Sequence, residues 1–347
     1  MKRLILTLFI MLLGFANANT IDDKISQMII LGFEGNNVND KGFQRILKEI
    51  NSISGVILFS KNIENFRELT KMTYELKQKS NIVPFIAIDN EGGEVLRFDF
   101  LEVKSAKEIS KLKEKDAKNE YLKLASANYE AGINLNFAPC VDLEINKNSI
   151  ISKKGRSYGD DYKKVIKYSS LLIDEHSKFG VITSLKHFPG HGSFEGDTHQ
   201  GFVDATKTYT EDELKPYYEL KNLDKTTMVM VSHIFNSNFD EKYPASLSKN
   251  TIKGLLKEKI GFKGVIISDD YDMGAIRDNY KLDEIVVRAI NSGVDILLFS
   301  NNLGYKDKNL SKKIHKIIKR EIKHGNIKEE DINKSYDKIM EIKKTLQ

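Results

Sequence analysis

Eight short apolar runs recur along this chain, and they constrain its fold more than any other feature of the sequence. Each is rich in Ile, Val, Leu or Phe, and they span residues 28–33, 55–59, 84–89, 134–139, 181–188, 228–233, 264–269 and 294–300. Continuous apolar runs, unlike alternating ones, are typical of strands that are buried on both faces. The runs therefore predict a parallel sheet covered on both sides.

Most of the intervals between these runs have the spacing of amphipathic helices. After the first run, apolar residues follow Asn39 or Asp40, a candidate helix cap, at i, i+3, i+4 and i+7: Phe43, Ile46, Leu47 and Ile50. After the fourth, a helical pattern opens at Asp160 and closes at Gly180. A strand followed by a helix, about eight times, predicts an α/β fold of the (β/α)8 TIM-barrel type.

The two ends of the chain have their own signatures. Lys2 and Arg3 precede an apolar run over residues 4–13, and Ala16-Asn17-Ala18 forms a small-x-small cleavage site, so residues 1–18 predict a signal peptide. The apolar run has about ten residues, whereas a membrane-spanning helix needs about 20. We expect an exported protein, periplasmic or secreted, without a stable membrane anchor after cleavage. At the other end, isoleucines interrupt the lysine-rich residues 305–345 at near-helical spacing, which predicts terminal amphipathic helices.

Composition narrows the remaining possibilities. No linker rich in Pro or Ser divides residues 19–347, so we expect one barrel domain that ends in helices. The net charge of +5 comes from interspersed acids and bases, which indicates a solvated surface and no nucleic-acid partner. Cys140 is the single cysteine and cannot form an internal disulfide.

Polar residues gather where four of the runs end. The third run ends in Asp89, the fifth in Lys186-His187, the sixth in Ser232-His233 and the seventh in Asp269-Asp270. In a barrel of this type all strands open their C-terminal ends on one face, so we expect these side chains to meet in one pocket. Taken singly, a strand-end Asp can cap a loop, and His233 can be a satisfied core histidine.

The stretch from Lys186 to His199 concentrates the ionisable groups and holds three of the seven histidines. Pro189 ends the strand, and three glycines after it predict a mobile loop. Asp197 and His199 are two apart, so both side chains project to one side of an extended chain and can touch. Such a contact fixes the imidazole tautomer and suits proton transfer near neutral pH. The simpler alternative is a pair of solvated residues in a polar loop.

Two chemistries fit these residue types. One is glycoside cleavage by a carboxylate nucleophile with a separate proton donor, and the other is metal-assisted hydrolysis by His and Asp ligands. A metal site favours closely spaced histidines on rigid strand ends, but the first run ends in Gly32-Phe33-Glu34, and His191 and His199 lie in a glycine-rich loop. We therefore predict neither a metal nor another cofactor.

Seven motifs, in unbroken order, resemble those of the glycoside hydrolase family 3 β-N-acetylhexosaminidases, and the likeness extends over residues 22–300. They lie at residues 88–93, 136–142, 155–159, 186–199, 232–233, 244–248 and 264–270. Larger relatives add a second domain, and this chain is similar to the single-domain, peptidoglycan-recycling branch. The resemblance implies a retaining exo-β-N-acetylglucosaminidase that releases terminal N-acetylglucosamine, with peptidoglycan fragments as the expected carbohydrate partner.

The resemblance also implies the site residues. Asp269 would be the nucleophile that forms a glycosyl-enzyme, and His199 the acid/base, oriented by Asp197. A histidine donor departs from the usual pair of carboxyls, and the family resemblance is the only ground for it. Five further residues would bind the terminal sugar: Asp89, Arg97, Arg156, Lys186 and His187.

The chain departs from the family pattern at a few positions. Asn90, Glu94 and Thr198 stand where relatives usually have Gln, Arg and Ser, and Glu94 reverses a charge near the expected pocket mouth. An exported location is a further departure, because the Gram-negative recycling enzymes of this branch are typically cytoplasmic.

Two other functions remain as alternatives. A β-glucosidase of the same family generally takes its acid from a glutamate elsewhere and lacks the Asp197-Thr198-His199 pattern. A non-catalytic glycan-binding barrel would have no need of Asp197, His199 and Asp269 together.

Overall fold

A computed structural model describes residues 19–221, 223–224, 226–302 and 306–346. The expected signal peptide, residues 1–18, lies outside these residues. Among the described helices, none combines the length and the apolar character that crossing a bilayer requires.

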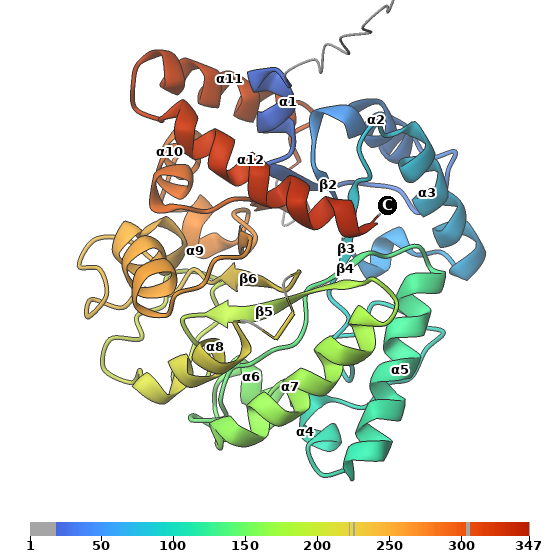
Figure 1. Ribbon diagram of the computed structural model, residues 1–347, viewed down its shortest axis with the longest axis vertical. Helices are drawn as coiled ribbons and strands as arrows, with labels where there is room; N and C mark the ends of the chain where they lie inside the picture. Colours follow the sequence, from blue (N-terminus) through green and yellow to red (C-terminus); the bar gives the residue numbers. More distant parts are fainter. Residues whose placement is uncertain (1–18, 222, 225, 303–305, 347) are drawn as a thin grey trace, which may run out of the picture.

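The described chain contains eight parallel strands, one within each of the eight apolar runs (Figure 1). Their order around the sheet is β7-β6-β5-β4-β3-β2-β1-β8, so each strand of the series β1 to β7 lies beside its neighbour in sequence. The strands are β1 Ile29–Gly32, β2 Gly55–Leu58, β3 Phe85–Ile88, β4 Leu135–Asn136, β5 Ile182–Phe188, β6 Met228–Val231, β7 Ile266–Ser268 and β8 Leu297–Phe299. Every strand residue is buried, as the continuous apolar runs predict. The predicted (β/α)8 barrel is confirmed.

The junction of β7 and β8 closes the barrel differently from the other strand pairs. Ile267 and Ile296 form an isolated bridge there instead of a ladder. Side chains complete the contact: Asp295 Oδ2 accepts the Ile266 N–H at 2.9 Å, Ser268 Oγ accepts the Leu298 N–H at 3.0 Å, and Asp270 Oδ1 accepts the Ser300 N–H at 2.8 Å. These bonds satisfy backbone donors that a ladder would otherwise pair.

Helices occupy most of the intervals between strands, and two more end the chain. They are α1 Ile21–Ser26, α2 Lys41–Glu49, α3 Phe66–Lys79, α4 Ala106–Ile109, α5 Glu114–Glu130, α6 Ile150–Lys153, α7 Tyr162–Ser177, α8 Lys215–Leu220, α9 Gly274–Arg277, α10 Leu282–Ser292, α11 Leu310–Lys323 and α12 Glu329–Lys343, with a π-helical segment at Asn250–Lys259.

Helix limits follow local chemistry. Asp40 is the N-cap of α2, and Phe43 and Ile46 are buried on its inner face, as the spacing predicts. Asp161, one residue after the predicted Asp160, caps α7 because its carboxylate accepts the Lys163 N–H at 2.9 Å.

The predicted amphipathic helices at the C-terminus are present. In α11 the buried face includes Ile314, Ile317 and Ile318. Helix α12 crosses the end of the barrel where the strands begin (Figure 1), and there Lys343 donates to Gln27 Oε1 and to the Ser54 carbonyl, both at 2.7 Å. Helix α12 therefore covers the end of the barrel opposite to the strand C-termini.

Candidate active site

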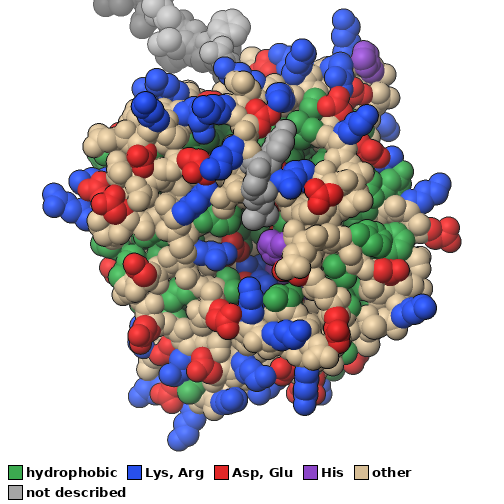
Figure 2. All heavy atoms as spheres, turned by 180° about the vertical axis from the view of Figure 1, so that it is seen from behind, with side chains coloured by type: hydrophobic (Ala, Val, Ile, Leu, Met, Phe, Trp, Pro, Cys, Tyr) green, Lys and Arg blue, Asp and Glu red, His purple; other side chains and the backbone are tan. Residues whose placement is uncertain are grey.

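The strand C-termini open into a cavity of about 270 Å³. It is lined by seven of the eight residues singled out in the sequence: Asp89, Arg97, Arg156, Lys186, His187, His199 and Asp269. Figure 2 shows this face, with a hollow near its middle where basic, acidic and histidine side chains meet. A wider groove of about 620 Å³ lies beside α10 and contains none of them. The expected convergence of strands β3, β5 and β7 on one pocket is confirmed.

Buried charges at one side of the cavity form a network around Lys186. Its Nζ lies 2.7 Å from Asp89 Oδ1 and 2.6 Å from Glu91 Oε1. Arg156 holds the same Glu91 in a bidentate pair, with Nε and Nη2 at 2.9 and 2.7 Å from its two oxygens. Burial opposes ionisation of Glu91, but Arg156 and then Lys186 lower its pKa well below the usual range. The network thus fixes two cations at the cavity wall. Glu91 itself was not predicted.

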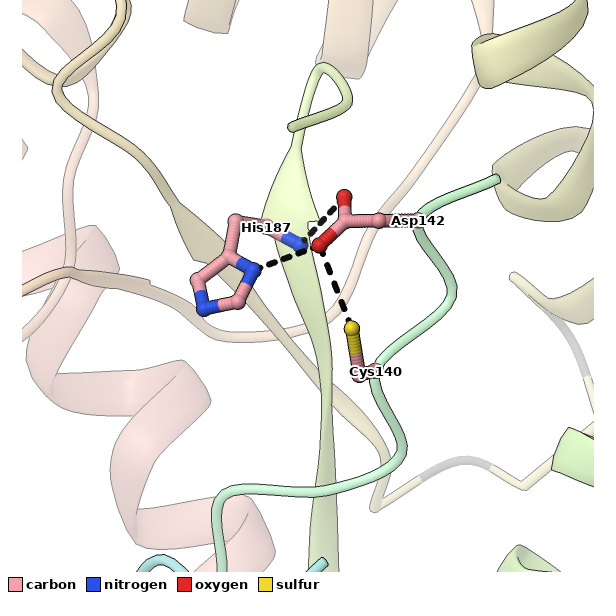
Figure 3. Close-up of side chains that lie close together, drawn as sticks. All are labelled: Cys140, Asp142 and His187. Carbon is pink, nitrogen blue, oxygen red and sulfur yellow. Dashed lines mark hydrogen bonds and ion pairs between the residues drawn. The ribbon is translucent and has the colours of Figure 1, made fainter. Parts of the chain in front are cut away.

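His187 is oriented by a second buried carboxylate, Asp142 (Figure 3). Asp142 accepts from His187 Nδ1 at 2.6 Å and from the His187 N–H at 3.1 Å. On the other side of the ring, His187 Nε2 lies 3.2 Å from Arg156 Nη2. Because guanidinium groups only donate, Nε2 accepts and Nδ1 carries the proton. Although burial opposes it, the contact with His187 lowers the pKa of Asp142 to about 2.

Cys140, Asp142 and His187 bring three potential metal-ligand atoms within 4.8 Å of one another. Hydrogen bonds already account for this closeness, since the Cys140 thiol donates to Asp142 Oδ2 at 3.2 Å. Burial raises the pKa of that thiol well above its usual range, so it remains protonated, whereas a metal ligand would be a thiolate. Cys140 and Asp142 therefore hold His187 in place through hydrogen bonds.

Two adjacent aspartates follow β7 and differ in environment. Asp269 lines the cavity, and its Oδ1 accepts the Asp270 N–H at 2.8 Å. Burial opposes its ionisation, but His233, His187 and His199 lower its pKa to about 2. Asp270 directs its carboxylate to the Asp272 and Ser300 N–H groups, and burial, aided by Asp272, raises its pKa to about 7. Asp269 is therefore the ionised carboxylate of the pair.

The Asp197 and His199 side chains make the predicted contact. Asp197 Oδ1 accepts from His199 Nδ1 at 2.7 Å and from the His199 N–H at 3.0 Å. The His199 side chain is 57% exposed and lines the same cavity as Asp269. The N-terminus of α9 binds this part of the loop, because Gly274 and Ala275 donate N–H bonds to the His199 and Thr198 carbonyls at 3.2 and 3.1 Å. The pair is thus held at the cavity by backbone contacts.

The polar residues that follow β6 do not line the cavity, although Met230 within that strand does. His233 is fully buried, with Nδ1 2.7 Å from Ser246 Oγ and Nε2 2.9 Å from the Asp270 carbonyl oxygen. The expectation that Ser232 and His233 join the pocket is wrong. His233 is instead the satisfied core histidine of the alternative interpretation, and it supports the segment that carries Asp269.

The positions that depart from the family pattern have different surroundings. Asn90 is buried and donates to Asn128 Oδ1 at 2.8 Å, so it does not face the cavity. Thr198 is also buried. Glu94 is exposed and lines the cavity, as does Lys154, a residue that the sequence did not single out.

Known proteins share this architecture and sequence. A family model described as "Glycosyl hydrolase family 3 N terminal domain" matches residues 20–342. A "Beta-hexosaminidase" of Tolumonas auensis is 34% identical over 261 residues, which are 72% of this chain and 76% of that protein. Its counterpart in Haemophilus influenzae is 31% identical over 263 residues, or 72% and 73% of the two proteins.

Solved structures extend the comparison. A glycoside hydrolase family 3 beta-N-acetylglucosaminidase from Paenibacillus sp. superposes with a TM-score of 0.84 at 28% identity, covering 94% of this chain and 63% of that one. This chain therefore spans less than two thirds of that structure. LpqI of M. tuberculosis superposes with a TM-score of 0.81 at 24% identity and covers 94% of each chain, which establishes a shared fold.

Proposed function

Because this chain belongs to glycosyl hydrolase family 3, we propose that it is a retaining exo-β-N-acetylglucosaminidase that hydrolyses terminal β-linked N-acetylglucosamine. Its relatives at 34% and 31% identity are named beta-hexosaminidases, and a similar structure is titled a beta-N-acetylglucosaminidase. One observation carries the proposal: the ionised Asp269 and His199, which is bonded to Asp197, line one cavity whose wall carries charged hydrogen-bonding groups.

In the first step, an Asp269 oxygen attacks the anomeric carbon while the bond from that carbon to the leaving oxygen breaks. His199 gives its Nε2 proton to the leaving oxygen, since Nδ1 is bonded to Asp197. The product is a covalent glycosyl-enzyme. In the second step, His199 takes a proton from water, which attacks the same carbon and releases Asp269. Two inversions give net retention.

The two proposed catalytic groups differ in how firmly the fold holds them. Asp269 follows a buried strand, and its carboxylate accepts a bond from its own segment, so it is fixed for attack. His199 belongs to an exposed loop, which suits a group that must meet substrate, leaving group and water in turn.

The terminal sugar is bound, we infer, by the charged wall. Lys186, Arg156 and Arg97 supply donors, and Asp89 supplies an acceptor for hydroxyl groups. Arg97 lines the cavity, and its Nη2 lies 3.5 Å from Asp89 Oδ2.

We further propose that the natural substrates are peptidoglycan fragments met outside the cytoplasm. The motif order of the recycling branch and the signal-like residues 1–18 support this. Glu94 and Lys154 at the cavity mouth place both signs of charge where the departing group would lie.

Turnover of 4-nitrophenyl N-acetyl-β-glucosaminide tests the activity. We expect rapid release of nitrophenol from this substrate and little from 4-nitrophenyl β-glucoside. Preference for the glucoside would make the protein a β-glucosidase, and binding of N-acetylglucosamine glycans without any turnover would make it a glycan-binding barrel.

A further inference from the structure

Glu213 is a buried carboxyl outside the cavity that the proposed mechanism does not use. It lies in the 3-10 turn Glu211–Leu214, which leads into α8, and is only 1% exposed. Burial, aided by the charge of Asp142, raises its pKa to about 7. Acidic side chains are rarely buried to this degree without a cationic partner, and no salt bridge to Glu213 exists among the described residues.

The contacts of Glu213 are with the base of the loop that carries His199. Its Oε2 accepts the Gly192 N–H at 2.8 Å. Gly190 packs directly against it, since a Cβ at Gly190 would lie 2.5 Å from the Glu213 Cβ. Gly190 also has a φ of +139°, a conformation that favours glycine. Nearby, the Tyr209 hydroxyl donates to the Pro189 carbonyl at 2.9 Å. The turn therefore contacts the loop base at Gly190 and Gly192, and Tyr209, which precedes the turn, contacts it at Pro189.

The opposite side of the loop base rests on the segment that follows β4. Asp142 Oδ1 accepts the His191 N–H at 2.9 Å, and Asn146 donates its N–H to the Gly192 carbonyl at 2.9 Å. The two carboxyls are not equivalent. Asp142 has several donors, whereas Glu213 Oε1 is buried and has no hydrogen-bond partner among the described residues. Glu213 thus holds the loop through the Gly192 amide, and the Ser193 side chain of the same loop adds a contact that favours the ionised form of Glu213.

From this base, packing continues toward the catalytic pair. The His191 ring lies 4.6 Å from the Phe194 ring, centroid to centroid, and His191 Nε2 is 3.5 Å from the Thr198 hydroxyl. Thr198 is buried and adjoins His199. A displacement of the His191–Gly192 backbone would therefore shift His199 relative to Asp269.

We propose that Glu213 is a positioning residue for the acid/base loop, residues 190–199, and acts by holding the Gly192 amide. The assignment rests on the proposed function, because it gives His199 the role of proton donor. Glu213 touches no reacting atom, so its loss should weaken acid catalysis and leave attack by Asp269 largely intact.

The test compares Glu213→Ala with Glu213→Gln, which keeps an oxygen that can accept the Gly192 bond. Glu211→Ala, an exposed acid in the same turn, is the matched control. We expect Glu213→Ala to lower kcat/KM on an alkyl N-acetyl-β-glucosaminide about tenfold more than on the 4-nitrophenyl glycoside, whose leaving group needs little protonation. Glu213→Gln and Glu211→Ala should stay near the wild type on both substrates.

Hydrogen exchange of the loop peptide supplies a readout that does not need activity. The Gly192 region should exchange faster in Glu213→Ala and at the wild-type rate in Glu213→Gln. If Glu213→Ala fails to fold, Glu213→Asp takes its place, because the shorter acid withdraws from Gly192 while remaining a buried carboxyl.

Equal losses on both substrates together with unchanged exchange would overturn the assignment, and so would a Gln variant as impaired as the Ala variant. If the wild type cleaved neither glycoside, the proposed function would fail on its own, and the exchange measurement would still decide whether Glu213 holds the loop.

Discussion

At the scale of single residues, the surroundings of a carboxyl decide its chemistry more than its place in a motif. Asp269 and Asp270 are adjacent, yet the pKa of the first is about 2 and that of the second about 7. Histidines surround Asp269, whereas Asp270 is buried near Asp272. Near pH 7 Asp269 is fully ionised and Asp270 only partly so, which makes Asp269 the better prepared of the two for nucleophilic attack.

Asp269→Asn should therefore abolish turnover and leave the fold intact. An amide cannot form the glycosyl ester, and we expect kcat to fall about a thousandfold or more. Steady-state kinetics measure the loss, and thermal unfolding checks the fold. Asp160→Asn, which alters an exposed acid before α7, is the control and should retain activity. A substantially active Asp269→Asn enzyme would disprove the assignment.

His199→Ala should lose activity in proportion to how much the leaving oxygen needs a proton. We expect a loss of about a hundredfold or more on alkyl or sugar glycosides and a much smaller one on the nitrophenyl substrate. Azide should partly rescue the variant by attacking the glycosyl-enzyme unaided, which yields a β-glycosyl azide detectable by mass spectrometry and NMR.

Asp197→Ala should resemble His199→Ala more weakly, because the imidazole loses the hydrogen-bond partner that fixes its tautomer and orientation. Equal losses on good and poor leaving groups, without any azide product, would place the proton donor elsewhere.

Exhaustive chelation should leave turnover unchanged, since no proposed step uses a metal. Activity before and after EDTA treatment and dialysis provides the measurement. Loss of activity that zinc restores would instead give the Cys140, Asp142 and His187 cluster the role of a ligand set.

The residues that end strands could be predicted from sequence, whereas their supports could not. Asp89, Lys186 and Asp269 follow apolar runs, so their convergence follows from barrel geometry. Glu91 and Asp142 are buried partners of Arg156 and His187, which are 65 and 45 residues away along the chain. Local sequence patterns cannot predict these pairings, because the pairings depend on how the loops fold over the barrel.

At the scale of elements, strands were easier to predict than helix limits or loops. Both faces of this sheet are covered, so nearly every strand residue is buried and apolar. The strands can therefore be recognised in the sequence as continuous apolar runs. Helix starts depend on which of two adjacent polar residues caps them, and Asp161 rather than Asp160 caps α7. The prediction for the residues after β6 was wrong because His233 finds a buried hydrogen-bond partner, Ser246, in a neighbouring loop. Its side chain therefore lies in the core and not in the cavity.

Lys343 of α12 gives an element-scale prediction about pH. Burial lowers its pKa well below 10.5, so the unfolded chain binds more protons than the folded one in the range between the two pKa values. Stability due to this group must then rise with pH across that range. Lys343→Met removes the effect. Urea unfolding near pH 7 and pH 9 should show the wild type gaining stability relative to the variant, and an equal pH response in both would contradict the burial argument.

At the scale of the whole molecule, the two faces of the barrel have separate roles. The strand C-termini hold the cavity, and α12 covers the other end with Lys343 over the start of β2. In barrel enzymes, the residues at the C-terminal ends of the strands commonly serve catalysis, and those at the other end commonly stabilise the fold. This separation allows the loops around the cavity to differ without loss of the core.

Export is a prediction that concerns the location of the whole molecule. We expect the protein recovered from outside the cytoplasm to begin near Asn19, because Ala16-Asn17-Ala18 has the pattern of a signal-peptide cleavage site. N-terminal sequencing or mass spectrometry of the extracytoplasmic fraction measures this. Recovery of the chain only from the cytoplasm, with Met1 intact, would remove the proposed location and leave the proposed activity standing.

The junction of β7 and β8 has an evolutionary consequence. A ladder of backbone bonds tolerates many side chains, because every residue except proline brings the same donor and acceptor. Here Ser268, Asp270 and Asp295 replace part of that ladder, so closure of the barrel is encoded by particular amino acids. Two of these, Ser268 and Asp270, flank Asp269. Substitutions at this junction therefore act next to Asp269, the proposed nucleophile. Substitutions along the other strand pairs leave the backbone bonds of the ladder in place.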